Sequence, residues 1–179
     1  MFRLEKITIA HPCYGFVERL WISAFPGNER RDEADQRHNT DHNPLFSCLL
    51  ALEDGRPAGM FTLWDFGDFT YCEHFATDPA LRGRGLGARI VSEVMAMTGK
   101  PLVLEVEMPA DEMSRRRIGF YERCGLVCHH GFEYMQPPYR PGDAPLPMKL
   151  MSSPELKPSD LASAAAIIHK KVYNYNVTD

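Results

Sequence analysis

A run of alternating glycines between a predicted strand and a predicted helix constrains this chain more than any other feature of its sequence: Gly83, Gly85 and Gly87. The strand covers residues 69–77, and the helix after the glycines ends before Gly99. Glycine has no Cβ atom, so a ligand can approach the backbone closely at this loop. The first turn of a helix also has backbone N–H groups without internal partners and a partial positive charge. The segment therefore predicts a phosphate-binding site, flanked by Arg82, Arg84 and Arg89.

Other interpretations of these glycines require different neighbouring residues. A Walker phosphate loop ends in Gly-Lys-Ser or Gly-Lys-Thr, which this segment lacks. A dinucleotide-binding fingerprint has the spacing Gly-x-Gly-x-x-Gly, and here the third glycine comes one residue too early. A glycine-rich loop that only turns the chain remains open as an alternative.

Two motifs together resemble those of the GNAT superfamily of N-acetyltransferases. The first resembles the acyl-CoA pyrophosphate signature of that family, and it follows the strand segment 73–79: Arg82-x-x-Gly85-x-Gly87. The second consists of a strand that contains residues 104–106 and a helix that ends in the sequence YERCGL, residues 121–126. The matched segments run from about Glu73 to Leu126.

The resemblance implies an α/β (α+β) domain with a mixed, mostly antiparallel sheet that is flanked by helices and splayed at its central strands. It also implies transfer of an acetyl group from acetyl-CoA, the acyl-donor co-substrate, to a primary amine by direct attack. The amine would belong to a small molecule or to a peptide N-terminus. A non-catalytic acyl-CoA-binding module is the alternative. We expect the acyl-CoA N-acyltransferase domain at 1–152. Residues 153–179 would be a linker and a helix that packs either on this domain or on the second subunit of a homodimer.

The resemblance assigns a set of residues to the acyl-CoA. Backbone groups of the central strand would pair with the pantetheine arm, and those of the glycine loop would hold the pyrophosphate: Phe75, Ala76, Thr77, Arg82, Gly83, Arg84, Gly85, Leu86, Gly87 and Ala88. Ser114 stands where the family usually has asparagine, and its hydroxyl can still bond a pantetheine amide. Arg117 replaces a small residue, and it either contacts a CoA phosphate or indicates that the helix is shifted.

Two residues are candidates for catalysis. Glu73 is the only acid on the central strand, and many relatives have a carboxylate on this face that acts as the base, often through water. It would serve as base or as binder of the amine, unless it is merely a solvent-facing charge. Tyr121 matches the tyrosine that returns a proton to the CoA thiolate in this family, and its alternative role is a core aromatic beside Ile118 and Leu126.

The distribution of charge predicts a cationic acceptor. Acidic residues gather on or near the central strands: Asp65, Asp68, Glu73, Glu105 and Glu107. Arginines gather where the CoA phosphates are expected, at residues 82–89 and 115–117. We therefore expect a polyamine-like or amino-sugar substrate, or a basic peptide N-terminus, ahead of an acidic one. The net charge of −4 argues against a general nucleic-acid binder.

The remaining features predict a reduced, cytoplasmic protein without a membrane segment. The five cysteines are odd in number and include no Cys-x-x-Cys pair. No stretch approaches the 18 or so apolar residues of a membrane span. Cys124, Cys128, His129 and His130 are expected to be structural rather than metal ligands, and His74 a packed strand residue.

Elsewhere, periodicity predicts most of the secondary structure. Strands are expected at 4–9, 46–52, 58–64, 102–108, 127–134 and 146–151, and helices at 14–25 and 110–124. Residues 28–43 are almost wholly polar and predict a solvated helix or a mobile loop. Residues 136–143 should be irregular, and Ser159 is expected to cap a final helix with one apolar stripe.

Overall fold

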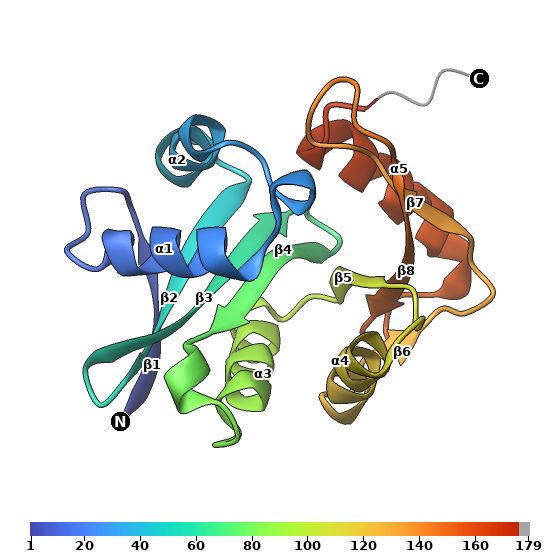
Figure 1. The fold of residues 1–179 in the computed structure, drawn as a ribbon. Coiled ribbons are helices and arrows are strands. Elements are labelled where there is room, and N and C mark those ends of the chain that lie inside the picture. The colour runs from blue at the N-terminus through green and yellow to red at the C-terminus, as the bar shows by residue number, and fades with distance from the viewer. Residues whose placement is uncertain (176–179) are drawn as a thin grey trace. The chain divides into compact units, whose positions relative to one another are not determined.

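A computed structural model describes residues 1–175 of the 179-residue chain, as two compact units (Figure 1). The first unit comprises residues 1–65 and 72–99, and the second begins with residues 66–71 and continues from Lys100. The strands are mostly antiparallel and are flanked by helices, which confirms the predicted α/β class. Within residues 1–175, no helix has the length and apolar character needed to span a bilayer.

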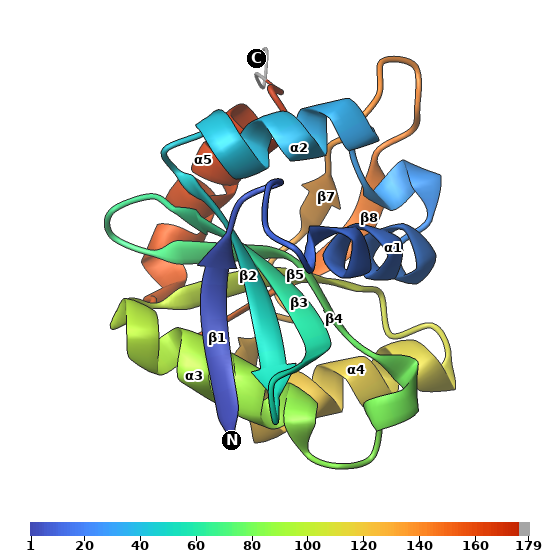
Figure 2. The same ribbon diagram turned by 90° about the vertical axis from the view of Figure 1, so that its left-hand side faces the viewer.

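The first unit holds one run of neighbouring strands with helices on both faces (Figure 2). The strands lie in the order β1 (Phe2–Ile7), β2 (Phe46–Glu53), β3 (Arg56–Asp65) and β4 (Thr70–Thr77), of which Thr70 and Tyr71 are counted in the second unit. Its helices are α1 (Tyr14–Ala24), η1 (Gly27–Glu29), α2 (Glu33–His42), η2 (Pro79–Leu81) and α3 (Leu86–Thr98). The β2–β3 hairpin turns at Asp54 and Gly55, both with positive φ, as a two-residue hairpin turn requires.

The polar segment 28–43 is more ordered and more buried than its sequence predicts. It forms η1 and α2, and Asp32 caps α2 by accepting a hydrogen bond from the Asp35 N–H at 2.8 Å. Gln36 and Thr40 are buried on one face of α2, and Arg31 just before it is only 5% exposed. The segment is thus a helix with a buried side.

The second unit is built around β8 (Leu146–Ser152), which pairs antiparallel with three other strands: β5 (Leu102–Glu107), β6 (Val127–Cys128) and β7 (Tyr134–Gln136). The helices of the unit are α4 (Glu112–Arg123), η3 (Pro158–Asp160) and α5 (Leu161–Val172). The residues of the apolar stripe of α5 are buried: Leu161, Ala164, Ala165, Ile168 and Val172.

Three local predictions in the second unit are wrong. The expected strand 127–134 is two short strands, β6 and β7, because residues 129–133 leave the sheet in a turn. Gln136, expected in an irregular segment, ends β7. Ser159 does not cap α5, because it lies inside η3 and its hydroxyl bonds the Asp160 carboxylate.

Candidate functional site

The glycine loop opens α3 as predicted. Gly85 is the residue before the helix and has a left-handed backbone with φ of 73°. No side chain within the described residues caps the helix, and its first turn has no acidic residue. The backbone N–H groups of this turn are therefore available to an anionic ligand. A Cβ atom added at Gly83 or Gly85 would meet nothing within 4 Å, so the loop is bare on the side that a phosphate would approach.

The three arginines beside the loop differ in how they are engaged. Arg89 pairs with Glu53, and its guanidinium carbon lies 4.4 Å from the centre of the Phe2 ring. Arg82 and Arg84 are exposed, and neither forms an ion pair within residues 1–175. The positive charges that a phosphate would meet are therefore those of Arg82 and Arg84.

The central strand β4 alternates as predicted. Glu73, Phe75 and Thr77 are half-buried residues on one face, whereas His74 and Ala76 are buried on the other. The Phe75 ring packs beside the Phe61 ring, with 5.4 Å between the ring centres. The predicted pantetheine-binding residues therefore lie in one regular strand. The pairing of their backbone groups with the pantetheine arm stays a prediction.

Glu73 is not the solvent-facing charge that one interpretation proposed. Its side chain is 0% exposed. Its carboxylate accepts a hydrogen bond from the Arg31 guanidinium, in a buried ion pair, and another from the Trp64 indole N–H at 2.9 Å. A guanidinium stabilises the charged form of a carboxylate and so makes it a weaker base.

Arg31 is the residue of the first unit that sequence reasoning missed. Its side chain is 6% exposed, and its guanidinium carbon lies 5.4 Å from the Trp64 ring centre and 5.8 Å from that of Phe46. It belongs to the polar segment before α2, where a run of charges predicts exposure. The pairing with Glu73, 42 residues away, compensates the burial of its charge.

His74 is a packed strand histidine, as predicted. It is 2% exposed, its Nε2 atom hydrogen-bonds the Glu29 carbonyl at 3.0 Å, and the rings of Trp21 and Phe25 meet it edge-on at 5.8 and 4.5 Å. Burial lowers the pKa of this imidazole, against the opposing effect of the Glu73 charge. The ring is thus neutral at neutral pH.

We expect His74→Gln to reduce the loss of stability in mild acid. Because the folded-state pKa is depressed, the unfolded chain takes up the proton first, so the free energy of unfolding falls as the pH drops below the ordinary histidine value of about 6.5. The loss stops growing once the pH passes the folded pKa. Urea unfolding at several pH values between 5 and 7.5 measures this slope. A slope that is unchanged in the variant would contradict the assignment.

Ser114 and Arg117 have local partners on α4 and β5. Ser114 forms a capping box with Asp111: its N–H donates to the carboxylate at 2.7 Å, and its hydroxyl accepts from the Asp111 N–H at 3.1 Å. Arg117 is exposed and forms an ion pair with Glu107, so its charge already has a partner in the protein. Both residues are therefore weaker candidates for cofactor binding than the glycine loop.

Tyr121 lies on the buried face of α4 with Ser114 and Ile118, and is 8% exposed. Its ring is 5.0 Å from that of Phe120. Its backbone carbonyl accepts hydrogen bonds from the N–H groups of Cys124 and Leu126 at 3.0 and 3.1 Å, which end the helix and fix this residue. This position suits a core aromatic and a held general acid alike.

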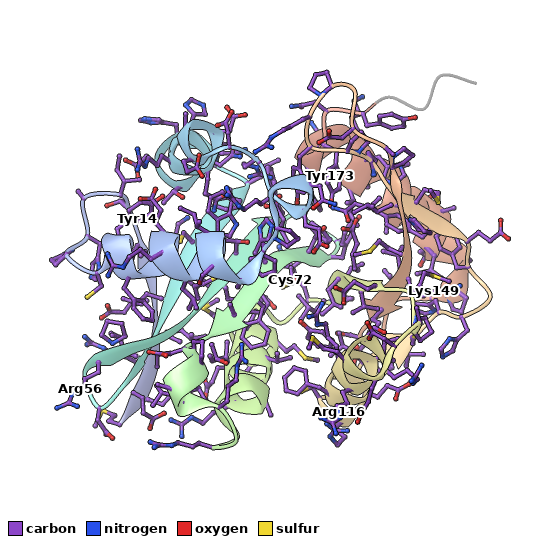
Figure 3. All side chains as sticks on the ribbon, viewed as in Figure 1. Tyr14, Arg56, Cys72, Arg116, Lys149 and Tyr173 are labelled. Atoms are coloured by element: carbon purple, nitrogen blue, oxygen red, sulfur yellow. The ribbon has the colours of Figure 1, made fainter. Side chains whose placement is uncertain are left out.

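The second unit contains a carboxylate that the sequence analysis did not single out as a site. Glu105 on β5 accepts a hydrogen bond from the Tyr134 hydroxyl through Oε1, and one from the Tyr173 hydroxyl through Oε2 at 2.7 Å. Tyr173, labelled in Figure 3, directly follows α5. The signal in the sequence was an acid inside an apolar strand, Leu102–Glu107.

The cysteines and histidines outside these clusters form no metal centre in the part of the chain described here, where no group of three or more suitable side chains occurs. All five cysteines are free. Burial raises the pKa of the Cys48 thiol to about 12, which makes it unreactive. The Cys128 sulfur lies 3.8 Å from Nδ1 of His130, which stands in the turn after β6.

Two kinds of comparison with known proteins gave matches, one with family models and one with solved structures. Residues 14–126 match the family model described as the acetyltransferase (GNAT) family. A protein of Bacteroides thetaiotaomicron assigned to that family is 39% identical, covers 97% of this chain and 99% of its own, and has a TM-score of 0.93. A comparison with curated protein sequences gave no match.

More distant structures share the fold alone. A GNAT family acetyltransferase from Elizabethkingia anophelis, solved with acetyl-CoA bound, is 14% identical over 85% of this chain and 97% of its own, with a TM-score of 0.57. The ribosomal-protein-S18-alanine N-acetyltransferase of Escherichia coli is 18% identical over 88% and 99%, with a TM-score of 0.58.

Proposed function

Because the chain belongs to the GNAT family of acetyltransferases, we propose that it transfers an acetyl group from acetyl-CoA to a primary amine. Its family makes it an acyltransferase, and acetyl-CoA is the acyl donor. The observation that carries the proposal is the uncapped, glycine-rich start of α3, with Arg82 and Arg84 beside it. The residues present fit a pyrophosphate because they offer N–H donors and positive charge without an opposing side chain.

Each part of acetyl-CoA has a proposed place. The backbone from Arg84 to Ala88 holds the pyrophosphate, and Arg82 adds charge. Backbone groups of Phe75, Ala76 and Thr77 pair with the pantetheine amides. The Ser114 hydroxyl can accept one further hydrogen bond beyond its capping contacts.

The reaction needs a base and an acid. A base takes the proton of the acceptor ammonium, the neutral amine attacks the thioester carbonyl, and the C–S bond breaks to release CoA thiolate. The Tyr121 hydroxyl returns a proton to that thiolate, and the phenolate so formed takes up the second proton of the attacking nitrogen, which the nitrogen loses as it becomes the amide. We assign the base to Glu105 instead of Glu73. The Tyr134 and Tyr173 hydroxyls that donate to Glu105 are neutral, so they weaken it as a base less than the full charge of the Arg31 guanidinium weakens Glu73.

The acceptor is proposed to be a small cationic amine or a basic peptide N-terminus. The fold is shared with the Escherichia coli enzyme named for an alanine of ribosomal protein S18 and with an Arabidopsis thaliana protein solved with a CoA–peptide analogue. Peptide N-termini therefore belong in the screen beside polyamines and amino sugars. Release of free CoA thiol with this panel separates an enzyme from a non-catalytic acyl-CoA-binding module.

The first test of the cofactor site compares two glycines of one helix. At about 100 times its dissociation constant, acetyl-CoA should stabilise the fold by roughly 2.7 kcal/mol. Gly85→Ala should weaken this stabilisation strongly, because the added methyl group stands where the phosphate approaches the backbone. Gly99→Ala is the matched control at the other end of α3, also left-handed, with φ of 61° and open space around it.

Both variants carry similar backbone strain, so both should melt earlier without ligand. Only Gly85→Ala should lose its response to acetyl-CoA. If millimolar acetyl-CoA does not change the melting temperature of the wild type, the proposed function is wrong. If acetyl-CoA stabilises the two variants equally, the phosphate does not bind at Gly85.

A further inference from the structure

Glu105 is held by a set of phenols that we call the tyrosine cluster, composed of Tyr71, Tyr134 and Tyr173. The three residues are 1%, 4% and 8% exposed, respectively. Tyr134 fixes one carboxylate oxygen and Tyr173 fixes the other. A carboxylate with both oxygens bonded from different sides cannot rotate freely, so its remaining lone pairs have a set direction.

The direction of the hydrogen bonds in the cluster follows from the chemistry. The Tyr173 hydroxyl donates its proton to Glu105, so the Tyr71 hydroxyl, 3.2 Å from that of Tyr173, must be the donor between the two phenols. Burial, followed by the Glu105 charge, raises the pKa of Tyr134 and of Tyr173 well above the ordinary value for tyrosine. Both phenols therefore stay protonated and remain donors.

The C-terminal helix supplies the support for this arrangement. Tyr173 follows α5, and the Tyr139 ring packs on it with 4.8 Å between ring centres. His169 of α5 packs on Tyr134 at 5.2 Å, and its carbonyl accepts the Tyr175 N–H at 2.9 Å, which closes the helix end. The helix lies beyond the residues 14–126 that match the family model. One helix thus supports both donors to Glu105.

We propose that Tyr173 is a positioning residue for acetyl transfer, and that its hydroxyl orients Glu105 toward the proton of the acceptor amine. The proposal rests on the proposed function, in which Glu105 is the base. It makes α5 part of the catalytic apparatus instead of a linker and docking helix. The proposal includes no contact between Tyr173 and acetyl-CoA, so the affinity for acetyl-CoA should not depend on Tyr173.

The test is Tyr173→Phe, which removes one oxygen and keeps the ring. The matched control is Tyr175→Phe, two residues along the chain, where the residue is 47% exposed and its ring lies 6.1 Å from that of His169. We expect Tyr173→Phe to lower kcat by roughly 10- to 100-fold, because a base that is out of place loses rate steeply. The dissociation constant of acetyl-CoA, read from thermal shifts, should stay the same. Tyr175→Phe should match the wild type in every measurement.

A pH profile distinguishes positioning from a general structural defect. Removing a donor destabilises the charged carboxylate, so the acidic limb of kcat/KM should move to higher pH in Tyr173→Phe. The variant leaves the Tyr134 hydrogen bond to Glu105, the ring contacts of Tyr139 and His169, and the Glu107–Arg117 pair on the same strand in place. It also takes from the Tyr71 hydroxyl the oxygen to which that hydroxyl donates, so the loss is confined to the hydrogen bonds of the Tyr173 oxygen. A lower kcat with an unmoved acidic limb would overturn the proposal.

A double-mutant cycle asks whether Tyr173 acts through Glu105. In a Glu105→Gln background, the further change Tyr173→Phe should cost little additional rate, because the residue that it positions is already lost. Rate losses that multiply would overturn the proposal. If the wild type turns over an amine and Tyr173→Phe does so equally well, only this inference fails. If the wild type releases no CoA with any amine, the proposed function fails and this inference with it.

Discussion

Tyr121→Phe should lower turnover by roughly 10²- to 10⁴-fold while acetyl-CoA still binds with little change in affinity. The phenol is expected to return a proton to the departing CoA thiolate, and the variant removes only that hydroxyl. The residue is 8% exposed and its backbone carbonyl holds the end of α4, so the phenylalanine ring should occupy the same place. A loss of kcat at constant affinity for acetyl-CoA would therefore show that proton transfer is lost, since the packing of the ring is kept.

Two comparisons sharpen this test. Tyr14→Phe makes the same change at a buried tyrosine of the other unit, labelled in Figure 3, and should leave turnover intact. An acyl donor whose thiol is more acidic needs less help in leaving, so it should recover part of the rate lost in Tyr121→Phe but gain little with the wild type. Unaltered turnover in Tyr121→Phe would make Tyr121 a packing residue beside Ile118 and Leu126.

Local patterns in the sequence were enough to predict the glycine loop and the alternation of β4. Gly85 and Gly99 bound α3 because left-handed residues suit both ends of this helix, and their chemistry is visible without any tertiary contact. The alternation of buried and half-buried residues from Cys72 to Thr77 follows from the geometry of any strand. Such features depend only on near neighbours in the chain.

Long-range pairs were beyond the reach of the sequence. Arg31 and Glu73 are 42 residues apart, and Tyr71 and Tyr173 are 102 apart. The predicted division of charge had the same weakness, because it counted Glu107 and Arg89 as open charges. In the structure Glu107 is paired with Arg117, and Arg89 with Glu53. The preference for a cationic acceptor therefore remains a prediction for the amine screen.

Removing one partner of the buried ion pair between Arg31 and Glu73 should strongly destabilise the first unit. Arg31→Met should lower the free energy of unfolding by roughly 3–5 kcal/mol, because it leaves Glu73 charged and buried without its guanidinium. Arg37→Met is the matched control on the same polar segment, since Arg37 pairs with Glu18 at the surface, where it is 51% exposed and its loss should cost little. Urea unfolding of the variants at neutral pH measures both effects.

We expect Arg31→Met to lose stability because the charge of Glu73 is no longer compensated, and not because the packing of the arginine side chain is lost. If so, adding Glu73→Gln should restore part of the loss, because the amide is neutral and its oxygen can still accept from the Trp64 indole N–H. Acid should act in the same way: as the pH falls, Glu73 in Arg31→Met takes up a proton, and the difference from the wild type should shrink. A double variant that is less stable than Arg31→Met, with a deficit that ignores pH, would show that Arg31 stabilises the unit through its stacking on Trp64 and Phe46 instead of through its charge.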